Sequence, residues 1–206
     1  MYIPAAFAMN DTNACHAMMR AHGFATLVTT DDTGAPFATH LPLVVEPGEG
    51  PLGTLYGHVA RPNEQWRHLQ VGRLGLAVFH GPHAYVSPRW YAGQPNVPTW
   101  NYTAVHATGR ARLIEEPAAL TALLDRLSKV YEDGKWTVAG LPPAYLAGMQ
   151  RGIVGFAIAI ERLEGKAKLS QNRNKADRDG AIAGLRATGD TESLATADLI
   201  DAATHP

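Results

Sequence analysis

The stretch of residues 80–106, HGPHAYVSPRWYAGQPNVPTWNYTAVH, restricts the fold more than any other part of this 206-residue chain. It holds two of the four tryptophans and four prolines, which are Pro82, Pro88, Pro95 and Pro98. Because proline fixes φ and removes a backbone donor, this stretch is predicted to be strand and shaped loop, not a long helix. So many aromatic side chains on a stiff backbone indicate either an irregular part of the core or the wall of a binding site.

The rest of the chain alternates β-rich runs with a few helical patterns. Strands are predicted at 24–30, 36–45, 54–60, 73–80, 84–87, 99–116 and 152–169, and helices at 12–22, 63–70, 117–132, 141–150 and 177–188. Many strands at short spacing with few helices predict a mainly β fold with helices, a barrel or a sandwich. The residues from about 187 to the end are acidic and rich in small side chains, so we expect a flexible tail there.

The charge balance argues against one class of partner. The formal net charge is -1 and the isoelectric point is near 6.7. Binding to nucleic acid needs clustered lysine and arginine, so direct DNA binding is not expected. The predicted helix at 117–132 offers only Arg126 and Lys129 as basic residues, which is a poor recognition surface.

Cysteine content and hydropathy predict a cytoplasmic protein. The single cysteine, Cys15, cannot form an intramolecular disulfide and is expected to be a small buried side chain. No apolar run is long enough to span a membrane, and the N-terminus lacks a basic segment before an apolar run.

The common catalytic and nucleotide-binding motifs are missing. No G-x-S-x-G, no P-loop and no G-x-G-x-x-G opening a helix is present, so no catalytic residue can be named. His80 and His83 are three apart, and residues three apart on a regular strand face opposite sides of the sheet. No metal site is therefore predicted, although haem or metal binding through the several histidines remains a competing hypothesis.

Five short segments bring planar rings, amides and a few cations to predicted strand ends. They are THLP (39–42), GHVARPNEQW (57–66), GPHAYVSPRWY (81–91), VPTWNY (97–102) and KLSQNR (168–173). Such a lining suits a flat heterocycle with a phosphate, held by apolar walls and a few placed donors. Equally, Trp66, Trp90 and Trp100 could be core or interface anchors, since aromatic side chains bury large areas. The residues alone leave both interpretations open.

These segments, together with MYIPAAF at the start and GIVGF at 152–156, resemble in this order the PaiB-type FMN-binding negative transcriptional regulators. The resemblance covers residues 1 to about 175. It implies an antiparallel FMN-binding split β-barrel, related to the pyridoxamine-phosphate oxidases, over residues 1–175. Residues 176–206 would then form a short helix and a flexible C-terminal tail.

The resemblance also implies a homodimer with FMN at the subunit interface. The positions implied to bind the flavin are Thr39, His40, Leu41, His58, Arg61, Asn63, Trp100, Asn101, Gln171 and Asn172. Thr39 stands where the oxidases commonly carry a phosphate-binding arginine, so the phosphate would be held differently. Trp100 and Asn101 would approach the cofactor from the partner subunit, and Gln171 and Asn172 would close the site over the ring.

Two functions follow from the resemblance. The first is negative transcriptional regulation through flavin or small-molecule binding. The alternative is an FMN-dependent oxidoreductase, such as a flavin reductase or an oxidase of a small substrate. The lysine and arginine pattern of true pyridoxamine-phosphate oxidases is not evident, which argues against that particular activity. The sequence does not decide whether the flavin is catalytic or a sensor.

Overall fold

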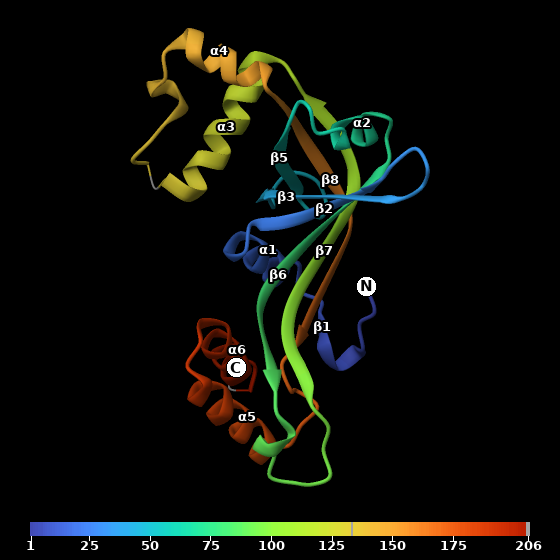
Figure 1. The fold of residues 1–206 in the computed structure, drawn as a ribbon, viewed down its shortest axis with the longest axis vertical. Helices are drawn as coiled ribbons and strands as arrows, with labels where there is room; N and C mark the ends of the chain where they lie inside the picture. Colours follow the sequence, from blue (N-terminus) through green and yellow to red (C-terminus); the bar gives the residue numbers. More distant parts are fainter. Residues whose placement is uncertain (133, 205–206) are drawn as a thin grey trace. The chain divides into compact units, whose positions relative to one another are not determined.

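A computed structural model of the chain describes residues 1–132 and 134–204 (Figure 1). Within these residues a mainly antiparallel sheet of eight strands has the order β3-β2-β6-β7-β8-β5-β4, and β1 pairs with β8. The strands are β1 (Ala8–Met9), β2 (Phe24–Thr30), β3 (Pro36–Pro42), β4 (Val44–Glu46), β5 (Thr54–Ala60), β6 (Leu74–Val86), β7 (Thr99–Ile114) and β8 (Ile153–Lys168). The helices are α1 (Thr12–Ala21), α2 (Gln65–Gln70), α3 (Pro117–Glu132), α4 (Pro143–Arg151), α5 (Lys175–Thr188) and α6 (Thr191–Thr204). Three short 3-10 turns are η1 (Ala5–Phe7), η2 (Pro88–Trp90) and η3 (Val138–Gly140).

The chain divides into two compact units. Unit 1 takes Met1–Asp11, His80–Val105 and the residues from Glu164 onward, and unit 2 takes Thr12–Phe79 and His106–Leu163. The long strands β6, β7 and β8 contribute residues to both units.

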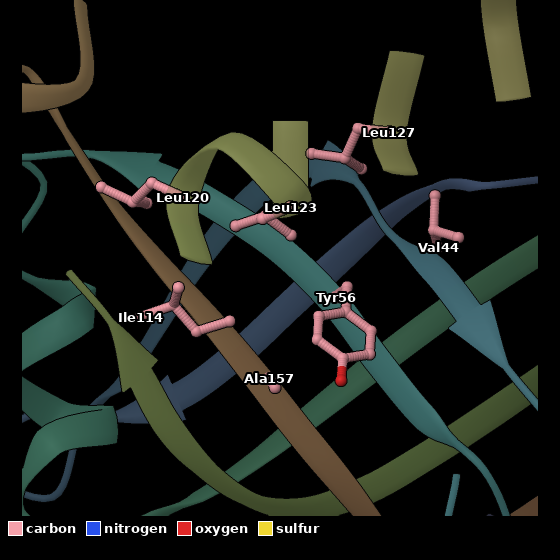
Figure 2. Close-up of a cluster of buried hydrophobic side chains, with 7 residues drawn as sticks. All are labelled: Val44, Tyr56, Ile114, Leu120, Leu123, Leu127 and Ala157. Carbon is pink, nitrogen blue, oxygen red and sulfur yellow. The ribbon is translucent and has the colours of Figure 1, made fainter. Parts of the chain in front are cut away.

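In unit 2, α3 covers a face of the sheet. Its buried residues Leu120, Leu123 and Leu127 recur three and four apart, as one stripe of a helix must. Figure 2 shows this stripe above the strands. The full cluster consists of Val44, Tyr56, Ile114, Leu120, Leu123, Leu127 and Ala157. The helix begins at Pro117, and the Glu116 carboxylate accepts hydrogen bonds from the amides of Ala118 and Ala119 at 3.1 and 2.8 Å. The predicted helix at 117–132 is confirmed.

In unit 1 the C-terminal region is helical where the sequence predicted a short helix and a flexible tail. Asn174 caps α5 by accepting a bond from the amide of Asp177 at 2.9 Å, and Gly189 ends it with φ of 79°. In α6 the buried residues are Ser193, Thr196, Ala197 and Ile200, spaced three, four and seven apart. Because most of these buried residues are small or polar, a hydropathy pattern does not reveal the stripe. The structure thus describes a second helix, α6, over most of the predicted tail, and the flexibility of this region stays a prediction; residues 205–206 lie outside the described part of the chain.

The proline-rich stretch that restricts the fold lies almost wholly in unit 1. The strand predicted to end at His80 continues through Pro82 to Val86. Ser87 then caps η2, where Pro88 occupies the first turn. Trp90 packs on α5, since a Cβ at Gly180 would lie 2.0 Å from its carbonyl oxygen. Of the two interpretations of this stretch, core packing holds for Trp90.

Candidate functional site

The β3 strand of unit 2 carries three of the predicted flavin residues on two different faces. Register pairs Thr39 with Leu27, and it pairs Leu41 with Ala25. Leu27 and Ala25 are buried, as is Leu41, so these side chains face the core. His40 pairs with Thr26 on the other face and is exposed. Alternation along a strand therefore lets His40, but not Thr39 or Leu41, present its side chain on the outer face.

Asn63 ties β3 to α2. Its Nδ2 donates to the Thr39 hydroxyl at 2.9 Å, and its Oδ1 accepts from the amide of Gln65 at 3.0 Å. Gln65 is fully buried, and its Nε2 donates to the carbonyls of Leu27 and Phe37 at 2.9 and 3.1 Å. The sequence analysis missed Gln65. In the structure, the side-chain amides of Asn63 and Gln65 both hold α2 on β2 and β3. Any contact of Asn63 with flavin remains a prediction.

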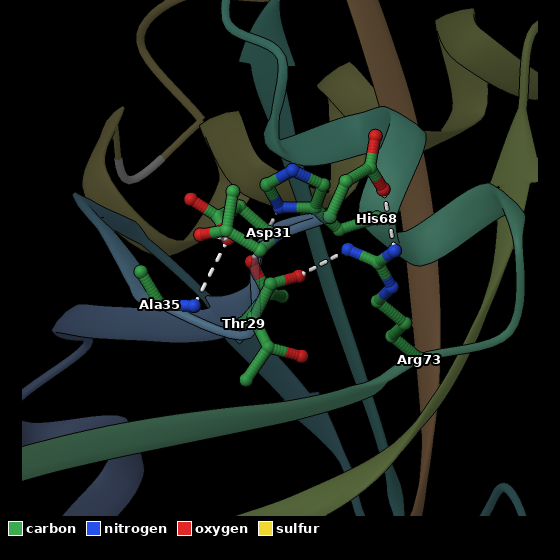
Figure 3. A network of polar contacts seen from close by, with 8 residues as sticks. Thr29, Asp31, Ala35, His68 and Arg73 are labelled. Atoms are coloured by element: carbon green, nitrogen blue, oxygen red, sulfur yellow. Dashed lines mark hydrogen bonds and ion pairs between the residues drawn. The ribbon is translucent and has the colours of Figure 1, made fainter.

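A second polar network joins α2 to the turn between β2 and β3 (Figure 3). The hydroxyl of Thr29 and Nδ1 of His68 lie 3.0 Å apart, and both residues are buried. Asp31 accepts from the amide of Ala35 at 2.9 Å, and hydrogen bonds in this turn, chiefly from Thr33, lower the pKa of the Asp31 carboxyl. Arg73 donates to the Thr30 carbonyl at 2.6 Å. These contacts satisfy the groups of the turn and therefore stabilise the hairpin.

Arg61, predicted to reach the phosphate, is held by its own unit. Its guanidinium donates to the carbonyls of Arg151 and Ile153 at 3.2 and 3.0 Å, and to the Glu115 carboxylate at 3.0 Å. Three of the five N–H donors of an arginine are thus engaged. Its carbonyl accepts from the indole Nε1 of Trp66 at 3.0 Å, so Trp66 packs beside the strand end.

His58 lies at a cavity below α3. The cavity has a volume of about 340 Å³ and is lined by Pro42, His58, Leu124, Leu127, Ser128, Tyr131, Glu132 and Trp136. Nδ1 of His58 is buried and has no hydrogen-bond partner among the described residues. Burial lowers the pKa of His58 below its ordinary value, because it disfavours the charged imidazolium.

The outer face of β3, β2 and β6 is a half-exposed apolar surface with one polar row. Register places His40, Thr26 and Val78 across the three strands in one row, and Ala38, Val28 and Leu76 in the next. Nδ1 of His40 and the Thr26 hydroxyl lie 2.9 Å apart. Phe24 adds a ring that is 70% exposed on this face. We call this surface, formed by Phe24, Thr26, Val28, Ala38, His40, Leu76 and Val78, the outer face.

Unit 1 holds the remaining predicted residues. Trp100 is 53% exposed, with the rings of His83 and Tyr85 each 6.2 Å away. Asn101 is buried and donates to the hydroxyl of Ser170 at 2.8 Å, while its Oδ1 has no partner within the described residues.

The KLSQNR segment is partly folded on itself. The amide of Gln171 bonds the backbone of Leu169 and Ala167, at 2.8 and 2.5 Å, whereas Asn172 is exposed. A flavin contact by any of these residues, or by Trp100 and Asn101, remains a prediction.

Lys166 on β8 escaped the sequence analysis, although alternation places it on one face with Lys168 of the KLSQNR segment. Lys166 is buried, donates to the Tyr2 carbonyl at 3.1 Å and lies 5.1 Å from the Tyr102 ring. Lys168 donates to the Thr99 hydroxyl, and burial lowers its pKa. Unit 1 therefore offers cations next to aromatic rings, an arrangement that suits anionic groups.

Neither a metal cluster nor a membrane helix is found in the described part of the chain. Over residues 1–132 and 134–204, no three His, Cys, Asp or Glu side chains gather closely enough to hold a metal ion. None of the helices within those ranges is long and apolar enough to cross a bilayer.

Comparison with known proteins gives the family and the fold. Residues 1–162 match the family described as "Putative FMN-binding domain". The chain is 37% identical over 204 residues to the protease synthase and sporulation protein PAI 2 of Bacillus subtilis, covering 98% of this chain and 97% of the relative.

Two solved structures resemble it in fold. The flavocytochrome Anf3 of Azotobacter vinelandii has a TM-score of 0.64 and 20% identity, over 78% of this chain and 69% of that one. The FAD and heme binding protein of Mycobacterium smegmatis has a TM-score of 0.63 and 18% identity, over 86% and 79%. The predicted fold class, a mainly β antiparallel split barrel with helices, is confirmed.

Proposed function

The chain belongs to the FMN-binding domain family, and on this premise we propose that its FMN lies on the outer face of β3, β2 and β6. The chemistry of the side chains on the outer face supports this location. It offers half-exposed apolar side chains, chiefly Val28, Ala38 and Leu76, next to the polar pair of His40 and Thr26. A flavin has the same two parts, a flat ring with apolar faces and an edge of hydrogen-bonding atoms.

The residues of unit 2 fit this cofactor. His40 would hold the polar edge of the ring, and the bond between its Nδ1 and the Thr26 hydroxyl fixes the orientation of the imidazole. Arg61 has two N–H groups beyond its three bonds (five less three), which could serve the phosphate. FMN supplies redox chemistry when bound, and the side chains bind the ring, orient it and limit its contact with water.

We also propose that a second copy covers the outer face in a homodimer. An apolar sheet face with a 70% exposed phenylalanine is a feature of interaction surfaces. In addition, β3 ends the strand order of the sheet, so one row of its backbone groups pairs with no strand among the described residues. A homodimer with FMN at its interface would bury both features.

For the biological role, we propose regulation through flavin or small-molecule binding, without direct contact to DNA, in the cytoplasm. The net charge of -1 gives DNA no general attraction. Arg126 of α3 is engaged with Glu46 and Glu49, at 3.2 and 3.0 Å, and so is not available to phosphates of a duplex. An FMN-dependent oxidoreductase is the second candidate, and the cavity at His58 favours it, since a small substrate would need such a space.

A titration of the purified chain with FMN, followed by flavin fluorescence and absorbance, tests the proposal. We expect a dissociation constant below about 100 μM, and a loss of about tenfold in affinity for His40→Ala. Lys129→Ala, at an exposed position of α3 away from the outer face, is the control and should bind as the wild type does. Equal FMN binding by both variants would reject the outer face as the flavin site. NAD(P)H oxidation and a low-salt gel-shift assay then separate the oxidoreductase from a DNA-binding repressor.

A further inference from the structure

The α3 helix carries more apolar surface than the sheet beneath it covers. Its core stripe consists of Leu120, Leu123 and Leu127. A second stripe, at Leu124, Leu127, Ser128 and Tyr131, follows the same spacing of three, four and seven, and it lines the His58 cavity. From the sequence alone, the second stripe looks like part of a wide core-facing surface of the helix. Its role has to be inferred from the residues that it lies beside.

This stripe borders a cavity that is flanked by aromatic side chains and contains one buried polar atom, Nδ1 of His58. Tyr131 and Trp136 are 57% and 43% exposed and flank the space. A second cavity of about 390 Å³ shares Leu124, Ser128 and Trp136 with the first, and α4 contributes Tyr145, Leu146 and Met149 to it. Volumes of this size are those of small-molecule sites, which are apolar with a few placed polar groups.

His58 supplies the placed polar group. Its buried Nδ1 has no partner among the described residues, and buried polar atoms in native proteins are almost always paired. A bound molecule that pairs with the imidazole would remove that cost. Burial keeps the ring neutral at neutral pH, so it carries one donor and one acceptor nitrogen.

We propose that this cavity binds a small uncharged aromatic molecule with one hydrogen-bonding substituent, of the phenol type, which stacks on Trp136 and Tyr131 and pairs with His58. Among the described residues the lining holds one carboxylate, Glu132, and no cation, so it disfavours a negatively charged ligand. An anionic ligand would be desolvated without a counterion there. The site goes beyond the flavin site proposed above, since it can fill in the absence of FMN. With FMN bound, the ligand would be the substrate or the effector.

The test is calorimetric titration of the full chain, with and without FMN, against three probes. Methyl 4-hydroxybenzoate should bind with a dissociation constant below about 1 mM. Methyl benzoate, which lacks the hydroxyl, should bind about fivefold to tenfold more weakly, and the 4-hydroxybenzoate anion should bind more weakly still. His58→Phe should abolish the difference between the phenol and the plain ester.

A cavity-filling variant gives the decisive comparison. Ser128→Phe places a ring inside the cavity and should abolish binding of methyl 4-hydroxybenzoate. Ala122→Phe places the same ring on the exposed side of α3 and should bind as the wild type does. Circular dichroism melting of each variant shows whether it folds. If Ser128→Phe melts early, His58→Phe carries the test through the loss of phenol selectivity.

The outcomes separate this site from the flavin site. Loss of the phenol with FMN affinity retained in Ser128→Phe supports the proposal. Loss of both ligands together, in a folded variant, would assign the cavity to the flavin and overturn it. Wild-type protein that does not bind methyl 4-hydroxybenzoate, or that binds all three probes alike, would also overturn it. Binding of methyl 4-hydroxybenzoate without binding of FMN would contradict the proposed flavin function and would still support this second site.

Discussion

Gly184 of α5 lies directly against the indole of Trp90, so closely that a Cβ at this glycine would stand 2.2 Å from the ring. Gly180, one turn earlier, meets the carbonyl of the same tryptophan. Two glycines four apart thus form a groove on the helix that receives Trp90. The packing of the proline-rich stretch in unit 1 depends on the absence of two side chains.

Gly184→Ala should therefore destabilise the protein. Forcing a methyl group against the ring costs about 1–3 kcal/mol, more than alanine gains over glycine in a helix. Urea unfolding measures the change. Gly148→Ala in α4 is the matched control, because its Cβ would meet only the end of the Arg151 side chain, at 3.7 Å. That variant should be as stable as the wild type or more stable, by up to about 1 kcal/mol. Equal effects in the two variants would contradict the groove.

Ile200→Ala tests whether α6 is part of the folded unit. Ile200 is fully buried in a cluster with Leu185 and Ala197, so its truncation should lower the free energy of unfolding by about 2–5 kcal/mol. Leu199→Ala, at a partly buried neighbour on the same helix, should cost less. Thermal melting and limited proteolysis measure both. An Ile200→Ala variant that melts with the wild type would restore the flexible tail that the sequence predicts.

Gln65→Leu should destabilise unit 2 while keeping side-chain volume. The substitution removes the donors to the carbonyls of Leu27 and Phe37, at a cost of about 1–3 kcal/mol for buried groups left unpaired. Gln70→Leu, an exposed position on α2, is the control and should change stability little. Guanidinium unfolding distinguishes the two. If both variants behave alike, the buried amide does not hold α2 on the hairpin.

His58 should make folding stability depend on pH in a defined direction. Its folded-state pKa lies below the unfolded value of 6.5, so the unfolded chain takes up the proton first. The stability contributed by the neutral, half-buried ring is present above pH 6.5 and is lost as the pH falls through that value toward the folded pKa. His58→Gln should flatten the fall in melting temperature between about pH 7.5 and pH 5.5. His80→Gln controls for the loss of one imidazole, and an equal flattening in both variants would contradict the assignment.

Much of the fold could be predicted because local pattern and tertiary packing agree there. The strands β2 and β5 and the helix α3 have the predicted bounds, since each has one clear periodicity. The run at 36–45 reads as one strand, yet Leu43 separates β3 from β4. In the same way, β6 continues past His80 because Pro82 is accommodated within the strand, which a proline rule applied locally does not foresee.

The candidate site was harder to predict because it depends on which face a side chain takes. Thr39 and His40 are neighbours in the sequence and face opposite sides of β3. Hydrogen-bond partners decide the rest, as when Arg61 and Asn63 bind within their own unit. The stripe on α3 beside His58 has the spacing of core residues, so only three-dimensional packing shows it to border a cavity. The family, by contrast, was recognisable from ordered motifs, and that recognition is confirmed.

The way β6, β7 and β8 are shared limits how function can be dissected. Each compact unit consists of stretches that are separated in the sequence. No single deletion therefore removes one unit and leaves the other intact. A truncation would remove parts of both units, so its phenotype could not be assigned to either unit alone. The contributions of the two units can be separated only by substitutions at individual positions.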